Sequence, residues 1–579
     1  MLLSNLDILA TAPGGVARLR ELILTLAVQG KLVPQDPADE PASVLLQKIR
    51  AEKDRLIAAK ALKREKNEPA LTDDELPFEL PDSWSWVALG EVIDIVRGIT
   101  FPADQKTREA APGRIACLRT SNVQLAIEWD DLLFVDRSFM GREDQLIQHH
   151  DIVMSMANSR ELVGKVALIE HVPHAEATFG GFLGVLRPRK IEPRYAMAVL
   201  RTPYARSLLI DSSSQTTNIA NVSLAKLRPL PFPLPPEAEQ SRIVTRVEEL
   251  MRLCDALETK GQLEAAQHAQ LVSTLLGALT ASTTPEELAE HWQRVAQHFD
   301  LLAGRPAAVD ALEQTLLQLA VRGLLVPQDP TDEPASVLLQ RIRAEKDRLI
   351  ATGQIKRDKL LPPITDEEKP FALPVGWEWV RLGEVADNRL GKMLDKAKNT
   401  GKRYPYLRNT NVQWRHIELD DIKEISLEAG ELEEFRLLPG DLLICEGGYP
   451  GRCAIWNEPD LEMYFQKALH RVRPRGGVAV ELIAISLESD SKSGNLEQHF
   501  TGATIKHFVG QALDRYVIPL PPLLEQSRIV ARVTTLRRLC ADLRQRLAER
   551  QSVQARLAEA LVANNAQTST QQEDECHAA

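Results

Sequence analysis

The stretch LVPQDPADEPASVLLQKIRAEKDRLIA (Leu32–Ala58) occurs a second time in the chain, as LVPQDPTDEPASVLLQRIRAEKDRLIA (Leu325–Ala351). The two copies differ only at Ala38/Thr331 and Lys48/Arg341 and lie at a constant offset of 293 residues. Self-similarity at a fixed offset indicates a duplicated architecture. The fold is therefore expected to consist of two related halves.

Further blocks extend this repeat. PFELPDSWSWVALGEV (77–92) matches 370–385, LRTSNVQ (118–124) matches 407–413, and LPPEAEQSRIVTRV (234–247) matches 520–533. Between these blocks, DIVMSMANSRELVGKVALIEHV (151–172) stands where the second half has DLLICEGGYPGRCAIWNEP (441–459). The strand-like flanks keep their pattern and the loop between them changes. Equal scaffolds with different loops are typical of two modules that do the same job on different targets.

Hydrophobic periodicity predicts short amphipathic helices at 16–29 and 309–322 and charged helices at 41–63 and 334–352. Residues 84–236 and 377–522 hold short β-like runs, and each is expected to have one helix, at 193–211 and 479–499. The predicted fold class is α+β. Two α/β domains in a pseudo-twofold arrangement are joined and spaced by two long antiparallel coiled-coil helices.

The two long helices are predicted at 237–280 and 523–563, each directly after a PLPP motif. Apolar residues recur every seven positions and suggest a coiled-coil seam that pairs the helices as a spacer about 60 Å long. The seam residues are Ile243, Val247, Leu250, Leu257, Ile529, Val533, Leu536 and Leu543.

The predicted organisation has six segments. They are a partner-binding helical repeat (1–83), a first domain (84–236), a spacer helix with the second helical repeat (237–376), a second domain (377–522), a C-terminal spacer helix (523–563) and a disordered tail (564–579).

The composition is that of an ordinary globular protein, with 579 residues, 44% apolar and 26% charged residues and a net charge of −11. The sequence has no long uncharged apolar run and no secretory signal, so no membrane contact is expected. Six cysteines without a CxxC pair are typical of a reducing cytoplasm and not of a disulfide framework or zinc site.

The sequence contains no recognisable catalytic motif. A GxxxxGK[ST] loop and an Asn/Asp-Pro-Pro-aromatic tetrapeptide are both absent. Three groups could suggest a site but have a simpler interpretation. A loop explains Gly180–Gly184 better than a cofactor site, and a solvated turn explains His149-His150 better than a metal site. Packed or loop residues explain Cys445, Glu446 and Cys453 better than a nucleophile. The chain is therefore expected not to be an enzyme by itself and to bind no cofactor or metal.

Basic residues gather in each domain, at Arg187–Arg206 and at Arg389–Arg408. Such patches can supply salt-dependent contacts to DNA phosphates, although a single basic run is usually a solvated loop. The candidate phosphate contacts are Lys106, Arg108, Lys392, Lys396, Lys398, Lys402 and Arg403.

Loops rich in amide, hydroxyl and charged groups are candidates for reading base edges, because these groups pair with adenine, guanine and cytosine in the major groove. The first domain offers Asn158, Ser159, Arg160, Gln215, Thr217 and Asn218. The second offers Glu446, Tyr449, Arg452, Thr504 and Lys506.

The doubled block at 26–56 and 319–349 and the PLPPxxEQSRIV blocks (233–244 and 519–530) resemble the specificity subunits of type I restriction-modification systems. GDLLICEGGYPGRCAIW (440–456) and TGATIKHF (501–508) are similar to the target-recognition domains of that family. The resemblance covers nearly the whole chain.

The resemblance implies a non-catalytic, cytoplasmic subunit that binds double-stranded DNA, each domain reading one half of a bipartite, asymmetric site. It further implies two modification (methyltransferase) subunits and additional restriction (translocase-nuclease) subunits as partners. S-adenosylmethionine, ATP and Mg would be bound by those partners. Two alternatives stay open: a coiled-coil adaptor that binds only protein, and a stand-alone methylating or cleaving enzyme.

Overall fold

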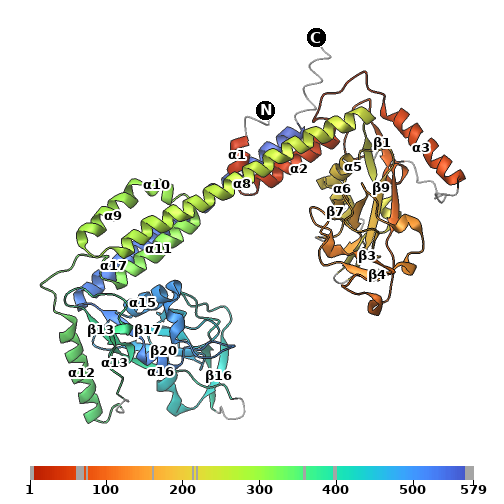
Figure 1. The fold of residues 1–579 in the computed structure, drawn as a ribbon. Helices are drawn as coiled ribbons and strands as arrows, with labels where there is room; N and C mark the ends of the chain where they lie inside the picture. Colours follow the sequence, from red (N-terminus) through yellow and green to blue (C-terminus); the bar gives the residue numbers. More distant parts are fainter. Residues whose placement is uncertain are drawn as a thin grey trace. The chain divides into compact units, whose positions relative to one another are not determined.

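The computed structural model describes residues 6–59, 71–72, 76–159, 162–211, 214–216, 219–355, 360–395 and 401–567. The chain divides into two compact units, which are here called unit 1 (Met1–Glu264 with Gln551–Ala579) and unit 2 (Ala265–Arg550). Each unit combines a β-rich domain with helices (Figure 1). Among the described residues no helix combines the length and the apolar composition needed to cross a lipid bilayer.

The domain of unit 1 is built on two main sheets. A four-stranded antiparallel sheet has the order β2-β9-β5-β7, and a three-stranded sheet has the order β4-β3-β8 with β3 and β8 parallel. Two smaller sheets pair β1 with β12 and order β10-β11-β6. The strands are β1 (Ser85–Ala88), β2 (Ile93–Arg97), β3 (Arg114–Leu118), β4 (Leu133–Asp136), β5 (Ile152–Ser155), β6 (Ala157–Asn158), β7 (Val166–Leu168), β8 (Ala177–Phe179), β9 (Leu183–Pro188), β10 (Ser214–Thr216), β11 (Ile219–Asn221) and β12 (Pro231–Leu234).

The domain of unit 2 repeats this plan strand for strand in its main sheets. Its four-stranded sheet has the order β14-β20-β17-β18, its three-stranded sheet β16-β15-β19, and β13 pairs with β21. The strands are β13 (Glu378–Arg381), β14 (Ala386–Leu390), β15 (Lys402–Leu407), β16 (Lys423–Leu427), β17 (Asp441–Cys445), β18 (Cys453–Trp456), β19 (Tyr464–Phe465), β20 (Leu469–Pro474) and β21 (Val517–Leu520). The sequence repeat is therefore a structural repeat, as predicted.

The predicted helices appear in the predicted order, and the described part of the chain also has helices that were not predicted: α9 and α10 between the two halves, and the short α1, α4, α7, α13, α14 and α16. The expectation of one helix in each domain is therefore wrong. Thr284 caps α9 through a hydrogen bond to the backbone N–H of Glu287, and Pro285 stands at its first turn. The helices are α1 (Leu6–Thr11), α2 (Gly15–Val28), α3 (Ala42–Ala58), α4 (Leu89–Val92), α5 (Pro193–Leu200), α6 (Pro203–Asp211), α7 (Leu224–Leu227), α8 (Glu237–Ala281), α9 (Pro285–Gln297), α10 (Phe299–Leu302), α11 (Pro306–Val321), α12 (Ala335–Ala351), α13 (Leu382–Val385), α14 (Leu432–Phe435), α15 (Val480–Ser493), α16 (Gly510–Arg515) and α17 (Leu523–Gln567).

The prediction of a single helix at 193–211 is wrong, because two helices, α5 and α6, occupy this range. Pro203 has no backbone N–H to continue the ladder, so a new helix begins there. The helix predicted at 479–499 ends as an α-helix at Ser493, because Gly494 adopts a left-handed conformation (φ 81°). A 3₁₀ turn at Asn495–His499 follows it.

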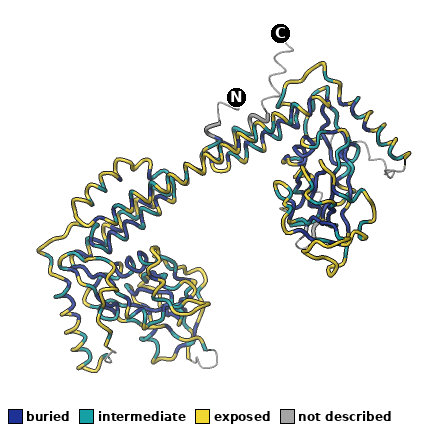
Figure 2. The backbone as a smooth tube through the Cα atoms, viewed as in Figure 1, coloured by how far each residue is buried: buried dark blue, intermediate teal, exposed yellow. Residues whose placement is uncertain are grey.

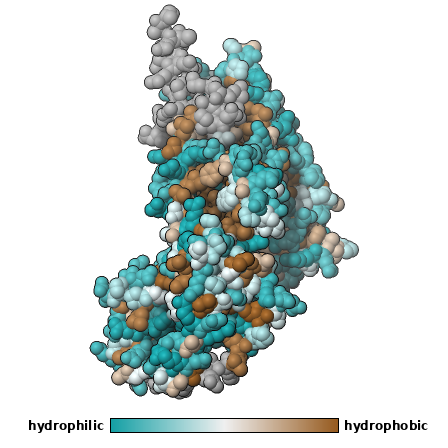
Figure 3. All heavy atoms as spheres, turned by 90° about the vertical axis from the view of Figure 1, so that its left-hand side faces the viewer, coloured by the Kyte–Doolittle hydropathy of each residue, from teal (hydrophilic) through white to brown (hydrophobic). Residues whose placement is uncertain are grey.

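The core of each domain lies around its four-stranded sheet, where runs such as IVMS in β5 and DLLIC in β17 are fully buried. Figure 2 shows buried backbone concentrated inside the two domains and along the helix packing. On the face shown in Figure 3, hydrophobic residues form small groups among hydrophilic ones, as is usual for the exterior of a folded protein.

The apolar stripe of the long helices packs differently from the predicted two-helix seam. In unit 1, Val247, Leu250 and Leu257 pack in a cluster with residues of α1 and α2, among them Leu19 and Ile23, and with Ala558 of α17. Ile243 joins the core of the domain itself. The stripe therefore serves a three-helix packing, in which the short helix of the repeat occupies much of the seam.

Unit 2 repeats this arrangement. Ile529 and Val533 contact residues of α11 and α15, and Leu536 and Leu543 join a cluster with residues of α11, among them Val309 and Leu316. The first part of α8 thus meets the last part of α17 in unit 1. In unit 2 Leu543 of α17 lines a small apolar hollow together with Val272 and Leu276 of α8. This is the order of contacts that antiparallel pairing of the long helices requires.

One hydrogen-bonded junction attaches each domain to its long helix. In unit 1, Trp84 Nε1 donates to Glu239 Oε2 (2.9 Å) and Gln35 Nε2 donates to Glu239 Oε1 (2.7 Å). In unit 2, the corresponding donors Trp377 and Gln328 bind Glu525 at 2.9 and 2.7 Å. Both carboxylates are buried. The Trp and Gln residues of the repeated blocks are thus explained by the bonds that they make to the EQSR motif.

Candidate nucleic-acid interface

Two loops of unit 2 that are distant in sequence meet at one end of the four-stranded sheet. Gly447 in the β17–β18 loop forms a β-bridge with His507. His507 Nδ1 lies 3.1 Å from Glu446 Oε2. Asn409 Nδ2 donates to the carbonyl of Gly447 at 3.0 Å. The EGGYPGR and TGATIKH segments, which were predicted separately as polar loops, therefore form one surface.

The β17–β18 loop presents an aromatic ring and a guanidinium together. The Arg452 guanidinium lies 4.6 Å from the centre of the Tyr449 ring, and Arg452 Nη2 donates to the carbonyl of Asn409 at 2.8 Å. Tyr449 is 68% exposed although it is a large aromatic residue. Gly451 permits the turn, since its φ is +85° and a Cβ there would lie 2.3 Å from the Leu496 side chain.

The neighbouring 501–507 segment supplies the remaining predicted residues of this domain. Thr504 and Lys506 are both exposed. Lys506 Nζ forms an ion pair with Glu497 Oε2 at 2.6 Å. The structure therefore places Glu446, Tyr449, Arg452, Thr504 and Lys506 on two adjoining loops.

Unit 1 joins the corresponding segments through a small sheet. Asn158 lies in β6 opposite Ala220 of β11, and β11 pairs with β10, which contains Gln215. The Asn158 side chain accepts a hydrogen bond from the backbone N–H of Ser159 at 2.9 Å. The predicted residues Arg160, Thr217 and Asn218 lie outside the described residues, as do Lys396 and Lys398 of unit 2.

The candidate phosphate contacts lie on or near the three-stranded sheets. Lys106 and Arg108 flank Thr107, which bridges Phe134 of β4, and Lys402 and Arg403 begin β15. Lys106 is exposed. Arg108 lies 3.4 Å from Asp131. The cations of unit 1 therefore lie beside the edge strand β4, and those of unit 2 lie at the start of the central strand β15.

Pairing with acids reduces the free charge of the second predicted patch. Arg403 lies 3.6 Å from Glu424, and the Lys402 Nζ lies 5.6 Å from the centre of the Tyr404 ring. Lys392 is less accessible than expected, because it is half-buried and pairs with Glu431.

The basic patch predicted at Arg187–Arg206 is largely wrong as a DNA contact. Arg187 is mostly buried and forms a bidentate pair with Asp151, with contacts of 2.7 and 2.8 Å. Arg189 pairs with Asp94, and Arg194 with Glu248. Each acid comes from a distant part of the sequence, so a local count of charges could not reveal the pairing.

The cysteines near Glu446 are structural. Cys445 and Cys453 are both buried. Burial raises the pKa of the Cys445 thiol to about 11, which keeps it protonated and weakly nucleophilic. Among the described residues no group of three or more His, Cys, Asp or Glu side chains is placed to hold a metal ion.

Asn409 was not predicted as part of this surface, and His507 was predicted only as the last residue of the TGATIKH loop, without a contact of its own. Asn409 follows β15 in the repeated LRNTNVQ block, whose first-domain copy has Thr120 at that place, and this difference is the only sequence signal. His507 lies 61 residues from its partner Glu446, so only the fold brings them together.

Comparisons with known proteins agree with this arrangement. The type I restriction modification DNA specificity domain matches the chain twice, at residues 81–267 and 374–550. The EcoAI specificity subunit of Escherichia coli is 36% identical over 94% of this chain and 93% of its own length, and the EcoEI specificity subunit of Escherichia coli is 34% identical with the same coverage.

A solved structure described as the basis of complex assembly and conformational transition of the type I R-M system is similar in fold. Its TM-score is 0.50 at 20% identity, and the match covers 85% of this chain and 99% of that chain. These findings give no support to a protein-only adaptor or a stand-alone enzyme. The chain belongs to the family of type I restriction-modification specificity subunits, the non-catalytic components that determine which DNA is recognised.

Proposed function

We propose that the domain of each unit reads one half of a bipartite, asymmetric DNA site through the loops described above. The observation that carries this proposal is the contrast between the two domains. Their main sheets have the same strand order, and the loops at one comparable place have different chemistry. Such a pair of domains can read two different sequences in one geometry.

In unit 2, Arg452 and Glu446 are suited to guanine and cytosine edges, Tyr449 to apolar base contacts, and Thr504 and Lys506 to polar ones. In unit 1, Asn158 with Ser159, Arg160, Gln215, Thr217 and Asn218 would favour adenine and other polar edges. Lys106, Arg108, Lys402 and Arg403, with Lys392, Lys396 and Lys398, would supply phosphate contacts that position the domains.

We further propose that two modification subunits and the restriction subunits assemble on the helical segments in the cytoplasm. S-adenosylmethionine, ATP and Mg would be bound by those partners, and this chain would determine the DNA sequence at which they act. Arg532 and Arg538 on α17 are exposed and available for such contacts. Arg537, between them, is engaged within unit 2, so reversing charge at Arg532 and Arg538 alone is the cleaner test of co-purification with the modification subunit.

The test of sequence reading is a domain exchange. Replacing Val87–Pro236 by the equivalent segment of a distant relative should change one half of the methylated motif in cells that carry the modification subunit. The other half and the gap should stay as they were. A change in both halves, or in neither, would show that the domains do not read separately.

The long helices should set the gap between the half-sites, because half-site spacing follows protein geometry. Inserting four residues after Leu257 adds about one helical turn, or ~6 Å. Methylome sequencing should then show a longer gap between unchanged half-sites. Altered half-sites with an unaltered gap would contradict this role of the helices.

A further inference from the structure

Unit 2 contains a buried cluster of charged side chains where its domain meets helices α11 and α17. Two carboxylates, Glu313 on α11 and Glu488 on α15, lie at its centre, and each side chain is only 2% exposed. The cluster, here called the charged cluster, comprises Glu313, Arg415, Glu488, Lys492, Arg537 and Arg544. Four cations thus surround two buried anions.

Arg415 makes the link from a loop of the domain to helix α11. Its Nη1 donates to Glu313 Oε1 at 2.8 Å, and its Nε lies 4.0 Å from Glu488 Oε1. Arg537 of α17 bonds Glu488 and lies 3.5 Å from Glu313. The two carboxylates therefore connect the domain to both helices.

The remaining cations complete the cluster. Arg544 of α17 donates to Glu313 Oε2, and Lys492 Nζ lies 2.9 Å from Glu488 Oε1. Buried charges are tolerated only when they are well paired, and pairs that join three elements are satisfied in one relative placement of those elements. The charged cluster consequently fixes the domain of unit 2 on its helices.

The equivalent positions of unit 1 can be identified from a shared contact. The backbone N–H of Glu192 donates to Gln240 Oε1, and that of Ala479 donates to Gln526 Oε1, both at 2.8 Å. Helices α5 and α15 therefore start at the same place. Counting along α5, Arg201 corresponds to Glu488, and the repeated blocks place Arg20, Met251 and Glu258 at the positions of Glu313, Arg537 and Arg544.

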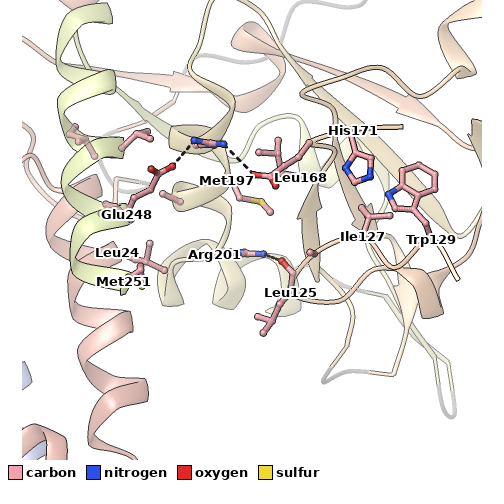
Figure 4. Close-up of a pocket in the computed structure, with 17 residues that line it drawn as sticks. Leu24, Leu125, Ile127, Trp129, Leu168, His171, Met197, Arg201, Glu248 and Met251 are labelled. Carbon is pink, nitrogen blue, oxygen red and sulfur yellow. Dashed lines mark hydrogen bonds and ion pairs between the residues drawn. The ribbon is translucent and has the colours of Figure 1, made fainter. Parts of the chain in front are cut away.

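Among the described residues of unit 1, Arg20 pairs at these positions with the exposed acids Asp255 and Glu258 of α8, and no buried carboxylate joins the domain to both helices. The space there is a hollow of about 370 Å³, lined largely by apolar residues such as Leu24, Met197 and Met251. Arg201 donates to the carbonyl of Leu125 at 2.6 Å, and Leu125 itself is exposed. Figure 4 shows Leu24, Met197, Arg201 and Met251 around the hollow. Arg194, which also lines it, pairs with Glu248 and Glu170.

Arg415 is an inserted residue with an uncommon backbone conformation. The turn in unit 1 is closed by Gln124 N donating to Ala126 O, whereas the turn in unit 2 is closed by Gln413 N donating to His416 O. The second turn is therefore one residue longer. Arg415 has a φ of +71°, which is strained for a residue with a side chain and points to a specific role.

We propose that Arg415 and Glu313 are positioning residues that hold the second DNA-reading domain in one orientation on its helices and thereby restrict the complex to a single gap between half-sites. The inference rests on the proposed function. The two domains then differ in how far each can shift on its own helices, because the domain of unit 1 has the shared Trp–Glu–Gln junction without a charged cluster.

The experiment compares methylomes of cells that carry the modification subunit with the full-length wild-type chain or with Arg415→Gly. Glycine accepts the left-handed backbone, so this change removes the guanidinium without adding strain. The expected result is methylation at gaps one base pair shorter and longer than the wild-type gap, with both half-site sequences unchanged. Glu313→Gln and Arg537→Met should broaden the gap in the same way.

Lys190→Gly is the matched control, since Lys190 in unit 1 also has a side chain at positive φ (54°). It should keep the single gap. A retained single gap in all three cluster variants would overturn the proposal, as would an equally broadened gap in the control. Loss of thermal stability without a change in gap would mean a merely structural role. A wild-type methylome without any bipartite motif would instead overturn the proposed function.

Discussion

The two units attach their DNA-reading domains in the same way at one contact and differently at another. The buried Glu239 and Glu525 accept the same pair of hydrogen bonds in their respective units. Beyond this junction, unit 2 has a charged cluster and unit 1 has an apolar hollow. The duplication has kept the contact that defines the fold, and the halves have diverged in how firmly the domain is held.

The largest effect is expected from Glu313→Ala, which leaves Arg544 without its buried partner and leaves Glu488 as the one carboxylate of the charged cluster near Arg415 and Arg537. Breaking a buried pair on one side costs about 3–5 kcal/mol. The matched change Arg20→Ala removes ion pairs with Asp255 and Glu258, in which each acid is at least half exposed, and should cost about 0–1 kcal/mol. Urea denaturation followed by hydrogen exchange of each unit would measure both. Equal losses in the free energy of unfolding would contradict the proposal that the buried ion pairs of the charged cluster hold unit 2, where unit 1 has ion pairs to exposed acids.

The next effect concerns the shared junction. Glu239→Ala and Glu525→Ala each leave a buried tryptophan N–H unpaired and remove one of the two hydrogen bonds that a glutamine amide donates. Each should therefore lower the free energy of unfolding of its own unit by about 1–3 kcal/mol. The same denaturation measurement applies. A cost confined to one unit would show that the two junctions are not equivalent.

A comparable effect on DNA binding is expected at the base-reading loops. Asn158→Ala should weaken discrimination in the half-site of unit 1 and Arg452→Ala in that of unit 2, each by about 1–3 kcal/mol at one base pair. Competition binding of the complex with modification subunits to singly substituted sites would measure this. An equal loss of affinity for all singly substituted sites would indicate that the residue contacts phosphates and does not read a base.

The smallest effect is expected in the pH dependence of thermal stability, compared between the wild type and Glu313→Gln. Burial raises the pKa of Glu313, but the hydrogen bond from Arg544 and the charges of Arg415 and Lys492 outweigh it and hold the pKa below its ordinary value. The stabilisation is therefore complete at neutral pH and is lost as the pH falls below about 4. Melting temperatures measured from pH 7 to pH 3 should fall more steeply for the wild type than for Glu313→Gln. Parallel curves would mean that Glu313 makes no such contribution.

The duplicated fold could be predicted from sequence because it rests on local and repeated signals. The β-strand runs, the amphipathic helices and the long helices after PLPP all appear where the patterns place them, apart from the break at Pro203, the unpredicted α9 and α10, and several short helices that were not predicted. Thr284, Pro285 and Glu287 carry an ordinary helix-start signal for α9. That helix could therefore have been found by the same reasoning.

Charge pairing could not be predicted in the same way. Arg187 and Arg189 form part of a basic run in the sequence, yet their partners Asp151 and Asp94 are 36 and 95 residues away. The seam residues were identified correctly as apolar helix positions. Their main packing partners, α2 and α11, depend on how the repeat folds back onto the long helix.

The ion pairs between short and long helices have opposite polarity in the two halves, with Arg20 bonding Glu258 in one and Glu313 bonding Arg544 in the other. As the chain folds, α2 and α11, which occupy corresponding places in the repeat, could each dock on the corresponding face of either long helix. Docking α2 at the position of α11 would bring Arg20 against Arg544, and the reverse error would bring Glu313 against Glu258. Like charges thus penalise the crossed assembly, and each segment is directed to its own half as the chain folds.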